Sequence, residues 1–344
     1  MKIIRTANKK PYLIATCLCV LAICSLAFYY FFTGFSTSNE TVYVYIDDDD
    51  TIDSVRIKLA DKASSHAITA LFTLLRHQDY AQNIRTGRYA IQPDEGVLRV
   101  FRKLKNGQQT PIMLTIPEAR TMSKLAGTLS RKMMFDSLTF INAVTDTLIT
   151  AQLDCTPYTM ASLFVPNTYE VYWNSSIDQF LQRMKKEHDA FWTNERLLKA
   201  EAIGLNANEV CTLASIIDEE TANTQEKPMI AGMYLNRLKQ EMPLQADPTI
   251  KFALQDFSIK RVRHGMLTVE SPYNTYQNTG LPPGPIKIAS IKGIDAVLNY
   301  VKHDYLYMCA KEDFSGTHNF AVTYKEHLKN AARYSDALNK RGIE

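Results

Sequence analysis

Three carboxylates stand close together in the segment Leu213–Thr221, which reads Leu-Ala-Ser-Ile-Ile-Asp-Glu-Glu-Thr. In a helix that turns about 100° per residue, Glu220 shares the apolar face with Ile216 and Ile217, and Asp218 falls near the opposite pole. A carboxylate among branched apolar side chains loses hydration, which raises its pKa toward the range in which it donates a proton near neutrality. The sequence therefore predicts that Glu220 is a general acid.

Two helices are expected to position this acid. Asn206 followed by Glu209 is typical of a helix N-terminal box, so the first helix should run from about Leu205 to Thr221. Thr224 and Pro228 then open the second helix.

Arg237 falls on the inward face of the second helix, three residues after Tyr234 and four after Met233. Either its aliphatic stem packs while the guanidinium reaches water, or the guanidinium pairs with a buried carboxylate. Asp247 is the candidate partner, although an Asp before a Pro is also a common turn residue.

The segments 271–276 and 280–286 form a long loop that is rich in Pro and Gly. Tyr273 and Tyr276 alternate there with Asn, Thr and Gln, which supplies flat apolar faces together with amide and hydroxyl groups. Such a mixture suits a sugar-binding cleft. The alternative is a plain connection whose tyrosines cover the core.

Two strands are expected near the end of the chain, at 305–310 and 316–321, followed by a terminal helix. The second strand contains His318, and the terminal helix contains His327. No Cys or second acidic residue stands at a metal-ligand spacing from either of them. We therefore expect structural or supporting roles for both, and no metal or cofactor.

Residues 12–33 contain no charge and are long enough to cross a hydrocarbon core as one helix. The basic residues Lys2, Arg5, Lys9 and Lys10 precede this segment without an acidic residue among them, which places the N-terminus in the cytoplasm and the rest of the chain outside. A cleaved signal peptide is the alternative, but its short apolar stretch and Ala-x-Ala exit are missing. An uncleaved anchor is the favoured interpretation.

A small α+β module is expected after a polar linker at 34–41. Its order is strand, helix, helix, strand, then a helix and a further strand, at 42–46, 51–63, 67–78, 87–91, 96–104 and 110–116. The four aspartates at 47–50 lack the spacing and turn glycine of a calcium loop, so they are interpreted as a turn before a helix N-terminus. Residues 123–192 are mostly helical in pattern, with an apolar loop at 163–170.

The composition excludes a strongly electrostatic partner. The net charge is +3, and the chain has no basic block or aromatic-interleaved basic stripe of the kind that nucleic-acid-binding proteins carry. The 344 residues are enough for a membrane anchor and one or two globular domains. Nucleic acid is not an expected partner.

Taken in order, the motifs of residues 213–330 resemble the membrane-anchored endolytic murein transglycosylases of the MltG, or YceG-like, type. The matching segments are Ala214-Ser215-Ile216-Ile217, Glu220-Thr221, Asn236-Arg237-Leu238, Leu244-Gln245, Asp247-Pro248-Thr249, Tyr273-Asn274-Thr275-Tyr276, Gly280-Leu281-Pro282-Pro283-Gly284-Pro285-Ile286, Tyr305-Leu306-Tyr307, and His318 with Phe320. The N-terminal part, with Gly87-Arg88-Tyr89 and Ile116-Pro117-Glu118, is similar to the LysM-like subdomain of that family, which implies glycan binding.

The resemblance implies an α+β architecture with a YceG-like catalytic domain. The expected divisions are a cytoplasmic N-terminus at 1–11, a transmembrane helix at 12–33, a linker at 34–41, a LysM-like subdomain at 42–115 and a catalytic domain at 116–344. The implied location is the bacterial inner membrane with the catalytic part in the periplasm, close to peptidoglycan glycan strands and to cell-wall synthases as possible partners.

By the resemblance, Glu220 is the catalytic residue, and it cleaves the β-1,4 bond between MurNAc and GlcNAc without water, which leaves 1,6-anhydroMurNAc ends. One carboxylate suffices because the C6 hydroxyl of the sugar is the nucleophile. The expected sugar contacts are Gln245, Tyr273, Asn274 and Tyr276, and Arg237 and Asp247 are expected to hold the cleft together. Asp218 stands where the family usually has Glu, a change that we expect to be tolerated.

Two other functions are compatible with the sequence. A muramidase would hydrolyse the same bond and would need a second carboxylate, for which Asp247 is the candidate. A peptidoglycan-binding membrane scaffold without enzymatic activity would need only the LysM-like module.

Overall fold

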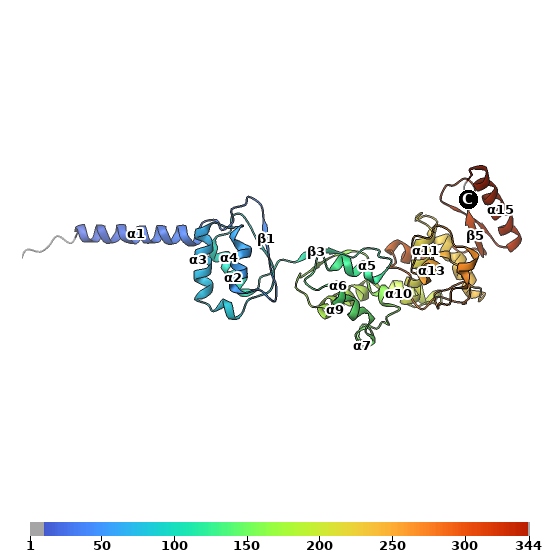
Figure 1. Ribbon diagram of the computed structural model, residues 1–344, viewed down its shortest axis with the longest axis horizontal. Coiled ribbons are helices and arrows are strands. Elements are labelled where there is room, and N and C mark those ends of the chain that lie inside the picture. Colours follow the sequence, from blue (N-terminus) through green and yellow to red (C-terminus); the bar gives the residue numbers. More distant parts are fainter. Residues whose placement is uncertain (1–9, 343–344) are drawn as a thin grey trace, which may run out of the picture. The chain divides into compact units, whose positions relative to one another are not determined.

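The computed structural model describes residues 10–342, and the chain divides into two units. The N-terminal unit comprises residues 1–113 and 170–174, and the C-terminal unit comprises residues 114–169 and 175–344. Both combine helices with short strands, so the chain is of the expected α+β class (Figure 1). The basic residues Lys2, Arg5 and Lys9, on which the expected orientation depends, lie outside the described residues.

The N-terminal unit begins with a long apolar helix. Residues 12–32 of this helix are the described segment that is long and apolar enough to cross a membrane. The elements of the unit are α1 (Lys10–Phe32), β1 (Val42–Ile46), α2 (Ile52–Ala60), α3 (Ser65–Arg76), η1 (Tyr80–Gln82), β2 (Gly87–Ile91) and α4 (Val97–Asn106). Their order matches the strand and helix pattern expected from the sequence.

Strands β1 and β2 pair in antiparallel fashion, with Val42 opposite Ile91 and Ile46 opposite Gly87. Helices α2 and α3 connect them, and α2, α3 and α4 cover a core that includes the fully buried Tyr89 and Leu71. The unit therefore has a strand, helix, helix, strand core, which agrees with the small α+β module expected from the sequence.

The four aspartates form a turn, as expected. Asp50 accepts a hydrogen bond from the backbone N–H of Asp47 at 2.7 Å, and Lys58 pairs with both carboxylates at 3.0 Å and 2.5 Å. In the described part of the chain, no group of His, Cys, Asp and Glu is arranged to hold a metal ion. A lysine from α2 thus pairs with two of the four aspartates.

The chain passes between the units in the strands β3 (Ile112–Thr115) and β4 (Thr168–Val171). Residues 163–170 were expected to be a loop, but their end forms β4. In the C-terminal unit, the Thr168 hydroxyl lies 2.9 Å from that of Thr115.

The C-terminal unit is mostly helical. Its remaining elements are α5 (Met122–Leu129), α6 (Ser137–Thr145), α7 (Thr147–Ala151), α8 (Met160–Leu163), α9 (Ile177–Phe191), α10 (Asn194–Ala202), α11 (Ala207–Glu220), α12 (Lys227–Lys239), α13 (Asp247–Ala253), η2 (His264–Thr268), α14 (Ile291–Leu298), β5 (Tyr307–Ala310), β6 (His318–Ala321) and α15 (Tyr324–Lys340).

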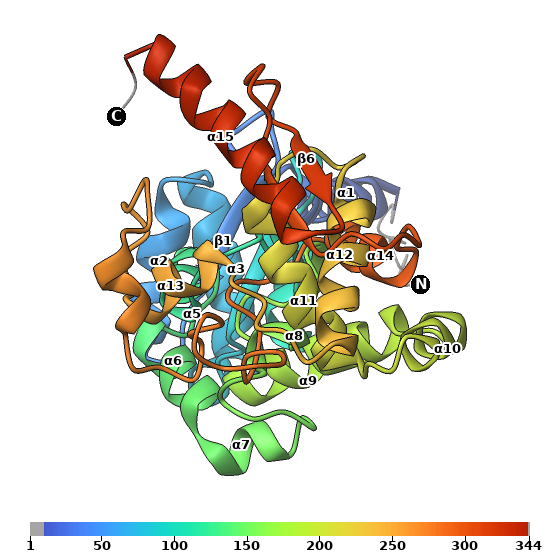
Figure 2. The same ribbon diagram turned by 90° about the vertical axis from the view of Figure 1, so that its right-hand side faces the viewer.

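Helix α11 is the centre of this unit, because α8, α10, α12, α13 and α14 all pack against it. Strands β5 and β6 form an antiparallel hairpin, with Tyr307 opposite Ala321, and α15 lies against this hairpin (Figure 2). The strands and the terminal helix occur where the sequence predicted them.

Candidate functional site

The acid Glu220 is the last residue of α11. The helix begins with the expected box, in which the Asn206 side chain accepts from the backbone of Glu209 at 3.0 Å and the Glu209 side chain accepts from that of Asn206 at 2.8 Å. Every residue from Val210 to Ile217 is buried, so the helix is enclosed on all sides. The expectation of a single apolar face is therefore wrong for the middle of this helix.

Among the residues that the structure describes, Glu220 has one hydrogen-bond donor, the hydroxyl of Tyr234 on α12, at 2.8 Å from its Oε1. Desolvation by the surrounding protein is the largest influence on the acid, and it raises the pKa of Glu220 to about 7. The charge of Asp247 also raises this pKa, while the Tyr234 hydrogen bond, the charge of His318 when its ring is protonated and the charge of Lys251 lower it. Glu220 therefore has the pKa that a general acid needs near neutrality.

A pocket of about 270 Å³ opens onto Glu220. Polar groups predominate along its surface. The residues that line it are Glu220, Met233, Tyr234, Arg237, Leu244, Gln245, Asp247, Tyr276, Met308, Cys309, Ala310 and His318. The pocket thus brings together the end of α11, the inner face of α12, the start of α13 and the β5–β6 hairpin.

Gln245, Asp247 and Tyr276 were expected at the site from the sequence, and all three line the pocket. The Tyr276 hydroxyl donates a hydrogen bond to Asp247 Oδ1 at 2.5 Å. Gln245 has a positive φ of 51°, and its backbone N–H donates to the carbonyl of Thr275 at 3.0 Å. This hydrogen bond joins the segment before α13 to the tyrosine loop, so both reach the same pocket.

Arg237 does not pair with Asp247, contrary to the hypothesis of a buried ion pair. Its guanidinium donates to the backbone carbonyls of Leu306, Pro243 and Leu244, at 2.6 Å, 3.0 Å and 2.9 Å. The residue is 6% exposed, so the snorkelling alternative is also wrong. Arg237 instead ties the residue before β5 to the segment before α13 by donating to their backbone carbonyls.

Tyr273 and Asn274, two of the expected sugar contacts, do not line the pocket. Tyr273 is 8% exposed and packs on Phe252, with ring centroids 4.6 Å apart. Asn274 is fully buried, and its amide donates to the carbonyls of Leu267 and Val269 at 2.9 Å and 2.8 Å. Both residues therefore lie on the buried side of the loop and stabilise it. For Tyr273, this is the alternative that the sequence left open, in which the tyrosines cover the core.

Sequence reasoning missed the roles of Tyr234, His318 and Glu226. Tyr234 was assigned to the inward face of α12, but periodicity does not show that its hydroxyl meets Glu220. His318 lines the pocket, and its Nδ1 lies 2.8 Å from Oε2 of the buried Glu226. The two residues are separated by 92 positions, so no local pattern could have joined them.

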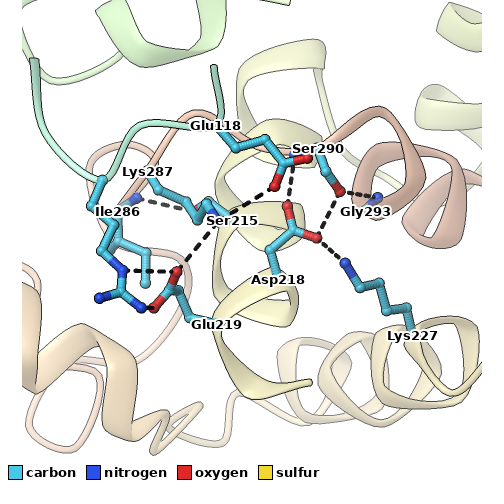
Figure 3. A network of polar contacts seen from close by, with 10 residues as sticks. Glu118, Ser215, Asp218, Glu219, Lys227, Ile286, Lys287, Ser290 and Gly293 are labelled. Atoms are coloured by element: carbon cyan, nitrogen blue, oxygen red, sulfur yellow. Dashed lines mark hydrogen bonds and ion pairs between the residues drawn. The ribbon is translucent and has the colours of Figure 1, made fainter. Parts of the chain in front are cut away.

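The side of α11 away from the pocket carries a second cluster, which we call the Asp218 anchor: Asp218, Lys227, Ser290 and Gly293 (Figure 3). The Asp218 side chain is 2% exposed and forms an ion pair with Lys227. Its two oxygens also accept from the Ser290 backbone N–H at 2.6 Å and from the Ser290 hydroxyl at 2.8 Å. Asp218 points away from the pocket as expected, but it is buried.

Helix α14 approaches the anchor closely. A Cβ added at Gly293 would lie 2.5 Å from Asp218 Oδ1, so this position has no room for a larger residue. Glu219, between the two buried acids, pairs with Arg120 at 2.8 Å and with Lys287 at 3.3 Å (Figure 3). Each carboxylate of the last turn of α11 thus has a different set of partners.

Comparison with known proteins identifies a family that matches this chain. The sequence profile of the YceG-like family matches residues 44–333. The endolytic murein transglycosylase of Bacillus subtilis (strain 168) is 29% identical over 281 residues, which cover 76% of this chain and 76% of the relative. The endolytic murein transglycosylase of Streptococcus pneumoniae serotype 2 (strain D39) is 28% identical over 293 residues, but this match spans only 52% of that protein's length.

One solved structure is also similar. The crystal structure of a yceG-like protein from Listeria monocytogenes covers 85% of this chain and 99% of its own, with 27% sequence identity and a TM-score of 0.56. The family match at residues 44–333 includes parts of both units and all the residues that line the pocket.

Proposed function

The chain belongs to the YceG-like family, and from this premise we propose that it is a membrane-anchored endolytic lytic transglycosylase of peptidoglycan. Two relatives that carry the name endolytic murein transglycosylase, each aligned with about three quarters of this chain, support the proposal. The substrate is the glycan strand, and the bond cleaved is the β-1,4 bond between MurNAc and GlcNAc.

The observation that carries this proposal is the raised pKa of Glu220, together with its position in the pocket. Its pKa is raised to about 7, chiefly by desolvation, and it faces a polar pocket. A glycosidic oxygen leaves as an alcohol only if it is protonated, so the reaction needs an acid that keeps its proton near neutrality. Glu220 meets that requirement in this pocket.

The reaction starts with protonated Glu220. The carboxylic acid donates its proton to the glycosidic oxygen, the bond from that oxygen to C1 of MurNAc breaks, and the GlcNAc side leaves as an alcohol. The C6 hydroxyl of the same MurNAc attacks C1 and loses its proton, which closes the 1,6-anhydro ring. That proton restores the acid form of Glu220, so no water is consumed.

Substrate binding is proposed for the side chains at the mouth of the pocket. Gln245 and Asp247 are exposed and Tyr276 is half-buried, so their polar atoms are accessible to sugar hydroxyl and acetamido groups. Arg237 is proposed to hold the wall of the cleft through its three carbonyl partners. Tyr273 and Asn274 are proposed to support the loop that presents Tyr276.

Helix α1 is proposed as the membrane anchor. The N-terminus would lie in the cytoplasm and residues 34–344 beyond the inner membrane, next to newly made glycan. The strand, helix, helix, strand core at 42–91 is proposed as a LysM-like glycan-binding module, which supports substrate capture near the membrane. Cell-wall synthases are proposed partners because they supply the strand that is cut.

One observation favours a second candidate function, a muramidase. Asp247 lines the same pocket as Glu220, so a second carboxylate is available to activate water. The hydrogen bond from Tyr276 to Asp247 Oδ1 orients the carboxylate. The second oxygen, Oδ2, is still available to activate water. Hydrolysis would leave reducing ends instead of anhydro ends.

The full-length protein in detergent, incubated with purified peptidoglycan, distinguishes the two reactions. Mass spectrometry of the released glycan should show 1,6-anhydroMurNAc ends, which are lighter by one water than reducing ends. Reducing ends alone would replace the transglycosylase by a muramidase. If Glu220→Gln released as much glycan as an active wild type, Glu220 would not be the catalyst of either reaction. If the wild type released no glycan, only the scaffold would remain.

A further inference from the structure

His318 lies in the wall of the pocket and is fixed by a single buried carboxylate. Its ring Nδ1 lies 2.8 Å from Oε2 of Glu226, and its backbone N–H donates to Oε1 of the same residue at 2.7 Å. Because both contacts come from one residue and end on one carboxylate, the imidazole has little freedom to rotate. The position of the ring is therefore determined by Glu226.

Glu226 also connects this ring to the end of α11. It stands at the N-cap of α12 and is 9% exposed. The hydroxyl of Thr221 lies 3.5 Å from Oε2 of Glu226, and Thr221 directly follows Glu220. Glu226 thus joins the two elements, α11 and β6, that bring Glu220 and His318 to the pocket.

The contact with Glu226 engages Nδ1 and leaves Nε2 as the ring nitrogen available to a ligand. A carboxylate accepts hydrogen bonds, so the contact with Glu226 favours the tautomer in which Nδ1 carries the proton. In the neutral ring, Nε2 then has a free lone pair, and it has no hydrogen-bond partner among the residues that the structure describes. The side chain is 15% exposed, so the ring edge remains accessible.

We propose that His318, held by Glu226, binds the C6 hydroxyl of MurNAc through Nε2 and accepts its proton as the anhydro ring closes. This inference rests on the proposed transglycosylase function and assigns a second catalytic residue to it. As the O6–C1 bond forms, the O6–H bond breaks and the proton moves to Nε2. The resulting imidazolium is stabilised by the Glu226 carboxylate.

One proton transfer, from His318 to Glu220, then completes the catalytic cycle. Glu220 has lost its proton to the leaving oxygen and is a carboxylate, and His318 has gained the proton of the C6 hydroxyl. Transfer of that proton from the imidazolium to Glu220 restores both residues. The acid that faces the leaving oxygen therefore does not have to reach the C6 hydroxyl on the other side of C1.

The substitution His318→Asn tests this role in the full-length protein. An Asn amide N–H can take the place of Nδ1–H toward Glu226, but nothing replaces Nε2. We expect a roughly 100-fold lower rate of anhydro-end formation, as for loss of a general base. We also expect a larger share of reducing ends, because water competes for the C1 cation when the C6 hydroxyl is not held.

Two further variants serve as comparisons. Glu226→Gln keeps an acceptor for Nδ1–H but removes the charge, so it should change rate and product ends in the same direction and to a smaller extent. His264→Asn alters an exposed histidine outside the pocket lining and should behave as the wild type. Thermal melting of each variant separates a folding defect from a catalytic one, and His318→Gln replaces His318→Asn if the latter does not fold.

The outcomes separate this inference from the proposed function. Wild-type protein that makes no anhydro ends contradicts the transglycosylase itself. Wild-type protein that makes them, together with a folded His318→Asn variant of unchanged rate and unchanged product ends, contradicts only the role of His318. A fall in rate with an increased share of reducing ends supports that role, because a purely structural defect would leave the ratio of ends unchanged.

Discussion

The pocket and the Asp218 anchor lie on two sides of the same helical turn, the last turn of α11. The carboxylates at these two places differ in the donors that surround them. Asp218 receives an ammonium group, a backbone N–H and a hydroxyl. Within residues 10–342, Glu220 accepts a hydrogen bond only from the hydroxyl of Tyr234. The number of donors therefore differs strongly between two acids that are two residues apart.

The difference shows how one helix end can serve both stability and chemistry. A buried carboxylate with a full set of donors is held in place, and removing one partner leaves an uncompensated charge. A desolvated carboxylate with few donors keeps its proton and can give it away. The anchor thus fixes the last turn of α11 so that Glu220 can remain poorly solvated at a defined position.

The substitution Glu220→Gln should have the largest effect on activity. An amide cannot donate a proton to the leaving oxygen, so we expect a decrease in glycan release of at least about 100- to 10,000-fold. The measurement is the rate of glycan release from purified peptidoglycan. Glu219→Gln is the matched control, since Glu219 pairs with Arg120 and Lys287 and does not line the pocket.

The substitution Asp218→Asn should have the largest effect on stability. It leaves Lys227, whose side chain is 8% exposed, without its ion-pair partner, which typically costs about 3–5 kcal/mol. Denaturant unfolding of the C-terminal unit measures the loss. Glu219→Gln again provides the comparison, because its more accessible ion pairs should contribute about 1 kcal/mol or less.

A result in which Asp218→Asn and Glu219→Gln unfold alike would mean that the anchor does not differ energetically from a surface ion pair. Gly293→Ala offers an independent test, because the new Cβ would lie 2.5 Å from Asp218 Oδ1. We expect it to destabilise the protein without removing any charge.

The stability of the protein should depend on pH through Glu220. The pKa of Glu220 is raised from 4.5 to about 7 on folding, so the folded state binds the proton more tightly than the unfolded state. The resulting stabilisation is complete below about pH 4.5 and is lost as the pH rises through 7. With about 1.4 kcal/mol per pKa unit, the loss is at most about 3 kcal/mol.

Comparing unfolding of the wild type and of Glu220→Gln between pH 5 and 9 tests this linkage. The amide does not ionise, so the variant should gain stability relative to the wild type as the pH rises. A difference that stays constant over this range would contradict the raised pKa. The rate of wild-type glycan release should also fall above pH 7, as the acid loses its proton.

The smallest effect is expected for Tyr234→Phe. The hydrogen bond from Tyr234 lowers the pKa of Glu220, so its removal should move the decline in activity to higher pH. At pH 6 the rate should stay within about tenfold of the wild type, since a single hydrogen bond is lost. A decline that moves to lower pH would show that Tyr234 does not favour the ionised form of Glu220.

Local patterns predicted most of the secondary structure correctly. The Asn206 box, the alternation at 42–46 and the apolar run at 12–33 each depend on neighbouring residues, so their helices and strands occur close to the predicted bounds. The choice of Glu220 on helix geometry likewise agrees with its burial and with the raised pKa.

Only the tertiary structure decided which side chains meet. Asn274 and Gln245 look alike in sequence as polar loop residues, yet one is enclosed by backbone carbonyls and the other faces the pocket. Glu226 meets His318 across 92 positions, and Asp218 meets Ser290 across 72. The sequence determined where helices begin and which acid lies among apolar neighbours, because those properties are local. Contacts between distant segments depend on the packing of whole elements, which short-range spacing does not contain.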